Sequence, residues 1–183
     1  MRLFIAINFE EAIREGMNET IEALKRLGVT GKFVNKENMH LTLVFIGEGG
    51  PAEQEKIESV MKAVKQSPFP LRIKGFGRFP RRGGGICWLG IEPSEPLFAL
   101  VTQLSEGLKA AGFVLEEREY KPHLTLGRQV VLPKDFDLPA FSRRIQPMTV
   151  SVKAFSLMQS VRVQDELRYL PLYTRELSVQ SKN

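Results

Sequence analysis

The sequence predicts an α+β fold made by duplication: a bilobal, pseudo-twofold structure whose mostly antiparallel sheets line a central cleft, with helices packed outside. Three observations predict it. The order strand, helix, histidine-bearing strand occurs twice. The only two histidines, His40 and His123, both stand in His-Leu-Thr-Leu, 123 − 40 = 83 positions apart. Helices do not alternate regularly with strands, as they would in a parallel α/β sheet. We expect a single domain, residues 1–183, with two internal repeats.

The first repeat begins with an alternating apolar stretch at 2–9, which predicts a strand. Apolar residues then recur at helical spacing over 13–27, ahead of a glycine suited to a helix C-terminus. The stretch 39–46 carries the first histidine and predicts the next strand. A proline at position 51 is typical of a helix start and opens a further helix.

The second repeat has the same order. Residues 85–93 predict a strand, 94–112 a helix, and 120–130 a strand that contains the second histidine. Aligning the first strands of the two repeats at a shift of 84 places Phe4 over Trp88, since 88 − 4 = 84. The agreement predicts a duplication of whole supersecondary units rather than a solenoid repeat.

Other segments complete the expected fold. Residues 69–79 predict a strand interrupted by glycines, followed by a turn. The stretch 133–141 predicts a loop. Residues 148–162 and 167–177 predict two strands paired as a hairpin. In all, the sequence predicts about seven strands and three helices.

Composition narrows the class of protein. The chain is 43% apolar and 26% charged, which is typical of globular proteins. Cys87 is the only cysteine, so neither an internal disulfide nor a cysteine zinc site is expected. No secretory leader or spanning stretch is evident, so we expect a cytoplasmic monomer with no membrane partner. The formal charge of +5 is compatible with a nucleic-acid partner, and equally with a charged, solvated surface.

The two His-Leu-Thr-Leu motifs predict a shared site. Residues two apart in a strand point to the same side, so His40 shares a face with Thr42, and His123 with Thr125. The leucines between them face the opposite side and would anchor each strand in a core. If the repeats pack about a twofold axis, two imidazoles and two hydroxyls converge in one cleft.

That set of groups suits cleavage of a phosphodiester. The reaction needs a base for the attacking oxygen and an acid for the leaving oxygen, and histidine serves as either near neutral pH. Threonine hydroxyls can donate to the phosphate oxygens. No metal-ligand spacing is present, so neither a metal nor a cofactor is expected. A single such motif would be read as a histidine packed on a sheet, but two matched copies that use every histidine favour catalysis.

The motifs "ENMHLTLVFIGE" and "REYKPHLTLGR", with "LFIAINF" near the start and "RYLPLYTREL" near the end, resemble the 2H phosphoesterase superfamily. Within it the chain is similar to the RNA 2′,3′-cyclic phosphodiesterase family, also called 2′-5′ RNA ligase-like. The resemblance implies hydrolysis of RNA 2′,3′-cyclic phosphate ends, such as those of tRNA fragments, to 2′-phosphomonoesters. It implies that His40 is the proton donor and His123 the proton acceptor, with Thr42 and Thr125 on the phosphate oxygens. Spacing alone does not distinguish the two histidines.

Three further residues are candidates for substrate binding. Arg128 lies five residues beyond His123, an offset that points it away from the catalytic face of a regular strand. A bulge at Gly127 would turn it toward the phosphate, a role that the resemblance favours. Phe33 stands where the family often has tryptophan. Phe33 and Tyr120 would either stack on bases or pack in the core.

A basic segment with interleaved aromatics precedes the second repeat. It suits either a phosphate backbone or a solvated turn over core phenylalanines. Its residues are Arg72, Lys74, Phe76, Arg78, Phe79, Arg81 and Arg82.

Two alternatives to the phosphodiesterase stay open at this point. The same acid and base would serve an RNA ligase that joins a 2′,3′-cyclic phosphate to a 5′-hydroxyl. A non-catalytic RNA-binding module is the other, and it predicts that neither histidine is needed for function. The sequence has no GxxxxGK[ST] loop of the kind that P-loop ATPases use.

Overall fold

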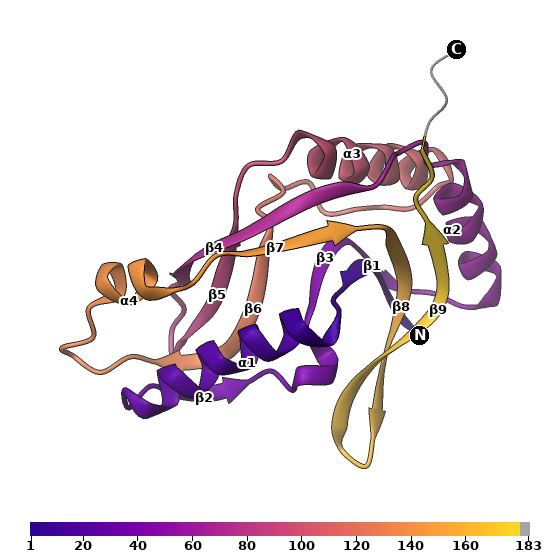
Figure 1. Ribbon diagram of the computed structural model, residues 1–183. Coiled ribbons are helices and arrows are strands. Elements are labelled where there is room, and N and C mark those ends of the chain that lie inside the picture. Colours follow the sequence, from indigo (N-terminus) through magenta and orange to yellow (C-terminus); the bar gives the residue numbers. More distant parts are fainter. Residues whose placement is uncertain (180–183) are drawn as a thin grey trace.

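The computed structural model describes residues 1–179, so the last four residues of the expected domain lie outside the described residues (Figure 1). The described chain has nine strands and four α-helices. The strands are β1 (Arg2–Asn8), β2 (Thr30–Phe33), β3 (His40–Glu48), β4 (Phe69–Phe79), β5 (Gly85–Ile91), β6 (His123–Val131), β7 (Met148–Val152), β8 (Ala154–Val163) and β9 (Glu166–Glu176). The helices are α1 (Glu11–Arg26), α2 (Pro51–Ala63), α3 (Glu95–Ala110), α4 (Leu138–Arg144) and a short 3₁₀ turn, η1 (Lys36–Asn38).

The strands form two sheets. One has the order β3-β1-β8-β9, and the other has the order β2-β6-β5-β4-β7. Every strand pair within them is antiparallel. The expected α+β fold with antiparallel sheets is therefore confirmed, and each sheet contains one histidine-bearing strand paired with the first strand of the same repeat.

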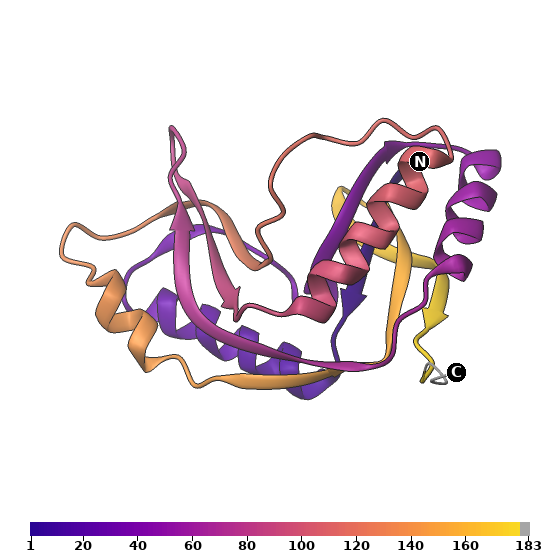
Figure 2. The ribbon, with the colours of Figure 1, turned by 90° about the horizontal axis from the view of Figure 1, so that it is seen from above.

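The helices of the two repeats are exchanged between the sheets. Helix α1 follows β1 of one sheet and leads into β2 of the other, where it packs beside β7. Helix α3 connects β5 to β6, yet it packs on β3 and beside α2 (Figure 2). The first helix of each half thus packs against the sheet that carries the other half's motif.

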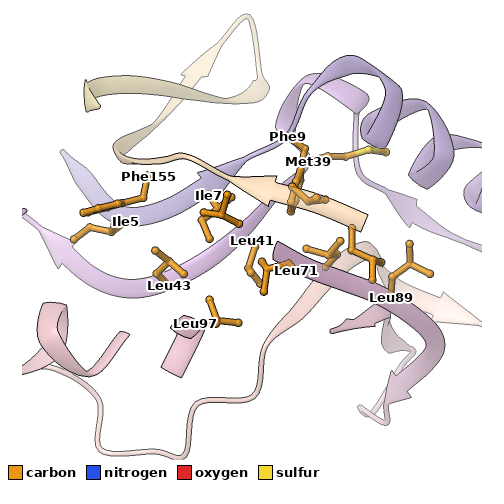
Figure 3. Close-up of a cluster of buried hydrophobic side chains, with 14 of the residues drawn as sticks. Ile5, Ile7, Phe9, Met39, Leu41, Leu43, Leu71, Leu89, Leu97 and Phe155 are labelled. Carbon is orange, nitrogen blue, oxygen red and sulfur yellow. The ribbon is translucent and has the colours of Figure 1, made fainter. Parts of the chain in front are cut away.

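One apolar cluster runs through both lobes. Figure 3 shows Leu41 of β3 between Leu71 of β4 and Leu97 of α3, with Leu89 of β5 farther along the same cluster. All four side chains are almost completely buried. Burial of this kind contributes about 1.5–3 kcal/mol for each large aliphatic side chain. The strands that carry the two histidines are therefore held by the same core.

Two elements differ from the expected ones in the first half and middle of the chain. Residues 30–33 form β2, which joins the second sheet beside β6 and was not expected. The stretch expected to be a loop at 133–141 contains the start of α4. The carboxylate of Asp137 accepts a hydrogen bond from the amide of Ala140, which caps this helix. Short elements of this size carry little periodicity in the sequence, so pattern alone does not detect them.

The C-terminal segment also differs. The expected strand at 148–162 is two strands, β7 and β8, separated at Lys153. β7 pairs with β4 in one sheet, whereas β8 pairs with β1 and β9 in the other. The expected hairpin with the last strand is confirmed for β8 alone. Which sheet each half joins depends on contacts far away in sequence, and these are invisible to local pattern.

The hydrogen-bond register refines the alignment of the repeats. Ala6 stands opposite Thr42, and Trp88 stands opposite Thr125. The structural shift between the first strands is therefore 88 − 6 = 82, two residues less than the sequence alignment suggested. A two-residue difference keeps the same face of the strand, so Phe4 and Trp88 still point to the same side as the histidines. Within residues 1–179, no helix is long and apolar enough to cross a bilayer.

Candidate active site

The two motifs lie at the first residues of β3 and β6. Along both strands the histidine and threonine are half-buried, while the leucines between and after them are almost fully buried. The expected alternation is therefore confirmed in both repeats. It leaves an imidazole and a hydroxyl side by side on the face of each strand that is turned away from the core.

The two motif faces lie close together although they belong to different sheets. Strands β3 and β6 are neighbours in space. The phenol of Tyr120, three residues before the second histidine, donates a hydrogen bond of 2.9 Å to the carbonyl of Thr42. The charge of Arg128 acts on the pKa of both imidazoles. The Arg128 guanidinium therefore lies within electrostatic range of both His40 and His123.

Both imidazoles are fixed in the same way. Nδ1 of His40 lies 2.6 Å from the carbonyl oxygen of Asn38, and Nδ1 of His123 lies 2.7 Å from that of Lys121. A carbonyl oxygen only accepts, so Nδ1 carries the proton in each ring. In the neutral ring Nε2 then bears the lone pair. Nε2 of His40 is 3.1 Å from the hydroxyl of Thr42, which can donate to it.

Aromatic rings flank each imidazole with similar geometry. Tyr169 of β9 meets the His40 ring edge-on, with centroids 5.0 Å apart and an interplanar angle of 86°. Phe79 of β4 meets the His123 ring at the same distance and angle. The wall is completed by Phe4, 5.1 Å from His40, and by Trp88, 6.4 Å from His123. These rings restrict the rotamers of the imidazoles and keep water from their sides.

Burial lowers the pKa of both histidines below the ordinary value of about 6.5. The hydrogen bonds to the carbonyls of Asn38 and Lys121 oppose this shift, and the positive charge of Arg128 adds to it. Near pH 7 the free protein therefore has two neutral imidazoles. An anion bound between them would raise both pKa values, because it favours the charged ring.

A β-bulge occurs at the same place in each repeat. The register between β1 and β3 shifts at Leu43, and the register between β5 and β6 shifts at Leu126. Beyond each bulge the buried residue is followed by an exposed one, Phe45 in β3 and Arg128 in β6. The two are equivalent, since 45 + 83 = 128. The bulge expected beside Gly127 is confirmed, and it returns Arg128 to the side of the imidazoles.

Phe45 is the residue that sequence reasoning missed. Its side chain is 50% exposed, and its ring lies 6.1 Å from that of Phe4 on the face that carries His40. The signal was present: Phe45 occupies the position in the first repeat that Arg128 occupies in the second. Recognising it required knowledge that both strands carry the bulge.

The two expected aromatic candidates have other contacts. The Phe33 ring lies against Gly127 of β6, with the ammonium of Lys25 from α1 5.6 Å from its centroid. Tyr120 packs half-buried against the core and edge-on to Phe98 of α3. Burial raises the pKa of the Tyr120 phenol. These contacts support the core alternative for both rings, and base stacking by either stays a prediction.

The basic segment at 72–82 does not act as one surface. Arg72 and Lys74 both contact the carboxylate of Glu92, and Arg78 reaches the carbonyl of Val130. Phe76 is buried. The turn between β4 and β5 presents two further exposed cations, Arg81 and Arg82, shortly after Phe79 at the site, and no ion pair is seen for either within the described residues. Elsewhere in residues 1–179, no three His, Cys, Asp or Glu side chains are grouped so that they could hold a metal ion.

An α+β fold of two antiparallel sheets, with a His-Leu-Thr-Leu motif at the start of each of two neighbouring strands, is the arrangement expected of the 2H phosphoesterase superfamily. Comparison with known families agrees with that class. The profile of the 2′-5′ RNA ligase superfamily matches residues 11–164, and the chain belongs to this family.

Relatives in three organisms illustrate the match. Proteins named RNA 2′,3′-cyclic phosphodiesterase are 34% identical in Thermotoga maritima, over 94% of each chain, and 34% identical in Archaeoglobus fulgidus, over 88% of this chain and 92% of that one. The Escherichia coli protein of the same name is 31% identical over 93% of each chain. The crystal structure of E. coli LigT in apo form superposes with a TM-score of 0.81 at 26% identity, covering 97% of this chain and 98% of that one.

Proposed function

We propose that the protein hydrolyses RNA 2′,3′-cyclic phosphate ends to 2′-phosphomonoesters, using its two histidines as acid and base and no metal. The relatives' names support the reaction class. One observation carries the mechanism: both imidazoles have Nδ1 bound to a backbone carbonyl, on adjacent strands, so that both Nε2 atoms are available for proton transfer.

His123 is the proposed proton acceptor. Its neutral Nε2 takes a proton from water as the water oxygen attacks phosphorus. The lowered pKa suits this role, because it keeps the ring unprotonated near neutral pH. The bond from phosphorus to the ribose O3′ breaks, which leaves the phosphate on O2′.

His40 is the proposed proton donor, an assignment that follows the family resemblance. Its Nε2 gives a proton to O3′ as that oxygen leaves. His40 must then be protonated when substrate is bound. Burial lowers its pKa in the free protein, and the anionic phosphate reverses that shift by favouring the charged ring. Proton exchange with solvent returns both rings to their starting states.

The phosphate oxygens are held by Thr42, Thr125 and Arg128 in this proposal. The hydroxyl of Thr42 already lies within hydrogen-bond reach of Nε2 of His40, where a phosphate would sit. The Arg128 guanidinium is exposed and its charge reaches both imidazoles. Charge-assisted donors of this kind stabilise the negative charge that builds up on the equatorial oxygens.

The nucleobase next to the cyclic phosphate is proposed to stack on Phe45. An aromatic ring that is half exposed beside Phe4, on the catalytic face, offers a flat apolar surface to any base. The proposed partner is RNA with a cyclic phosphate end, such as a tRNA fragment. A monomer suffices, because one chain supplies both histidines.

The test is incubation of the protein with RNA ending in a 2′,3′-cyclic phosphate, in EDTA, with the product isomer identified by chromatography. We expect a 2′-phosphate product and a loss of about 10²–10⁴-fold in kcat for His40→Ala and for His123→Ala. The wild-type rate in both variants would overturn the two-histidine mechanism, and absence of hydrolysis by the wild type would leave an RNA-binding module. Loss of the wild-type rate in EDTA would overturn the metal-free mechanism.

The family's ligase name favours a second candidate activity, the joining of a cyclic phosphate to a 5′-hydroxyl. The same groups would act with an RNA hydroxyl in place of water. Adding an RNA with a 5′-hydroxyl to the assay above distinguishes the two. A longer product that depends on both histidines would support ligation, and its absence would leave hydrolysis alone.

A further inference from the structure

Asn38 makes three hydrogen bonds that join two distant parts of the chain at His40. Its side-chain amide donates to the carbonyl of Leu167 at 2.7 Å, and its side-chain oxygen accepts from the amide of Tyr169 at 3.3 Å. Its backbone carbonyl accepts from Nδ1 of His40 at 2.6 Å. The side chain thus pairs with strand β9 as a neighbouring strand would, while the backbone fixes the imidazole.

Through β9, Asn38 positions Tyr169, whose ring packs against His40. The ring of Tyr169 lies edge-on to both the His40 ring and the Phe4 ring, with centroids 5.0 and 5.1 Å away. Loss of the two Asn38 side-chain hydrogen bonds would release the first residues of β9. These residues follow the hairpin turn in which Gln164 and Asp165 adopt positive φ. The ring of Tyr169 would then no longer limit the rotation of His40.

The turn that contains Asn38 is anchored on its other side as well. Lys36 of η1 binds the carboxylates of Glu11 and Glu15 from α1. Lys36 and Glu11 are part of an exposed cluster, so this anchor alone is weak. The half-buried side chain of Asn38 supplies the tie with directional hydrogen bonds.

We propose that Asn38 is a positioning residue for His40: through β9 and its own carbonyl it selects the imidazole tautomer and rotamer used in proton transfer. The proposal rests on the proposed function for its kinetic consequence. The second histidine has no such device. Lys121, which supplies the matching carbonyl, directs its side chain to a surface ion pair with Glu119 at 3.6 Å, where both side chains are mostly exposed.

The test uses Asn38→Ala, with Asn35→Ala as the matched control. Asn35 precedes the same turn, is exposed, and makes no capping hydrogen bond with its side chain. Because the chain has only two histidines, nitrogen-15 NMR of labelled imidazoles resolves His40 and uses His123 as an internal reference. The titrating or charged groups that influence His40 are Arg128 from β6 and, through its ring contact, Tyr169 from β9.

Asn38→Ala keeps the backbone carbonyl but removes the two bonds that hold the turn on β9. We expect the carbonyl to move relative to Nδ1, so that the His40 nitrogen shifts show a mixture of tautomers and a pKa closer to the ordinary value, while His123 is unchanged. With a 2′,3′-cyclic mononucleotide we expect kcat to fall about tenfold or more, since misplaced catalytic groups lose rate steeply, with little change in KM. Asn35→Ala should match the wild type in both measurements.

Wild-type His40 shifts and pKa in Asn38→Ala would overturn the proposal, whatever happens to the rate. If this variant does not fold, Asn38→Asp takes its place: it keeps the acceptor for the Tyr169 amide and loses the donor to Leu167, so we expect the same change in His40 tautomer. The NMR result needs no substrate. A wild-type protein that fails to hydrolyse cyclic phosphates would therefore refute the proposed function without deciding the role of Asn38.

Discussion

The hydroxyl of Tyr120 donates a 2.9 Å hydrogen bond to the carbonyl of Thr42, and this contact joins the approach to the second motif to the strand of the first. The ring is packed against the core, so the bond is shielded from water. It holds the segment that precedes His123 against Thr42, two residues after His40. The relative position of the two imidazoles therefore depends partly on one phenol.

Tyr120→Phe tests that dependence. It keeps the ring and removes the hydroxyl, which leaves a carbonyl without its donor. We expect the free energy of unfolding to fall by about 1–2 kcal/mol in urea titration, with a lower kcat. Tyr173→Phe on β9, whose ring contacts Lys62, is the control and should lose less. If Tyr120→Phe is as stable as the wild type but has a higher KM for the cyclic phosphate substrate, the hydroxyl contacts substrate instead of holding the two strands together.

Phe45→Leu tests the proposed platform for the base. Removal of the ring should raise KM for a cyclic mononucleotide about tenfold, because base stacking on an aromatic ring contributes roughly 1–3 kcal/mol. Phe45→Trp should retain a low KM. Phe98→Leu on α3, where the side chain is 42% exposed, serves as the matched control. Equal KM values in the leucine variants and the wild type would contradict a role for Phe45.

The pH dependence of kcat/KM reports the free protein. Activity requires one imidazole protonated and the other neutral, and the pKa of each is lowered. Both limbs of the bell-shaped profile should therefore lie on the acid side, with an optimum below about pH 6.5. A profile centred well above pH 7 would show that the lowered pKa values do not govern the reaction.

Arg128→Gln should move that profile to higher pH, because the guanidinium lowers the pKa of both histidines and its removal lets them rise. The loss of a charged donor should also reduce kcat/KM about 10²-fold. Arg128→Lys keeps the charge, so the profile should stay in place while the rate still falls. If the pH profile of Arg128→Gln is not shifted, the Arg128 guanidinium does not influence the pKa of the two histidines.

Gly77→Ala tests the wall beside His123. A Cβ atom at this position would lie 2.2 Å from the Trp88 ring, which packs against Phe79. The rigid ring must move, so we expect a loss of about 1–3 kcal/mol in unfolding free energy and a slower reaction. In Gly16→Ala the new methyl meets only the flexible thioether of Met148, and the loss should be smaller. Equal losses would indicate that Trp88 can shift freely.

Charge reversal of Arg81 and Arg82 tests the exposed cations of the turn between β4 and β5. Long RNA should bind more weakly to the double glutamate variant, and the slope of log affinity against log salt should flatten by about one or more. A cyclic mononucleotide, which does not reach the turn, should keep its KM. Unchanged affinity for long RNA would identify the turn as a solvated loop.

The sequence by itself determined the paired motifs, the alternation that puts His40 beside Thr42 and His123 beside Thr125, and the antiparallel α+β class. These are local properties, because the two-residue periodicity of a strand can be recognised from consecutive residues. Only the tertiary structure decided that 148–162 divides between two sheets and that the helices are exchanged between lobes. It also decided that bulges present Phe45 and Arg128 on the catalytic side, and that Asn38 binds β9. Such features arise from contacts between residues as far apart in sequence as Arg2 and Ser160, and local sequence pattern does not identify these partners.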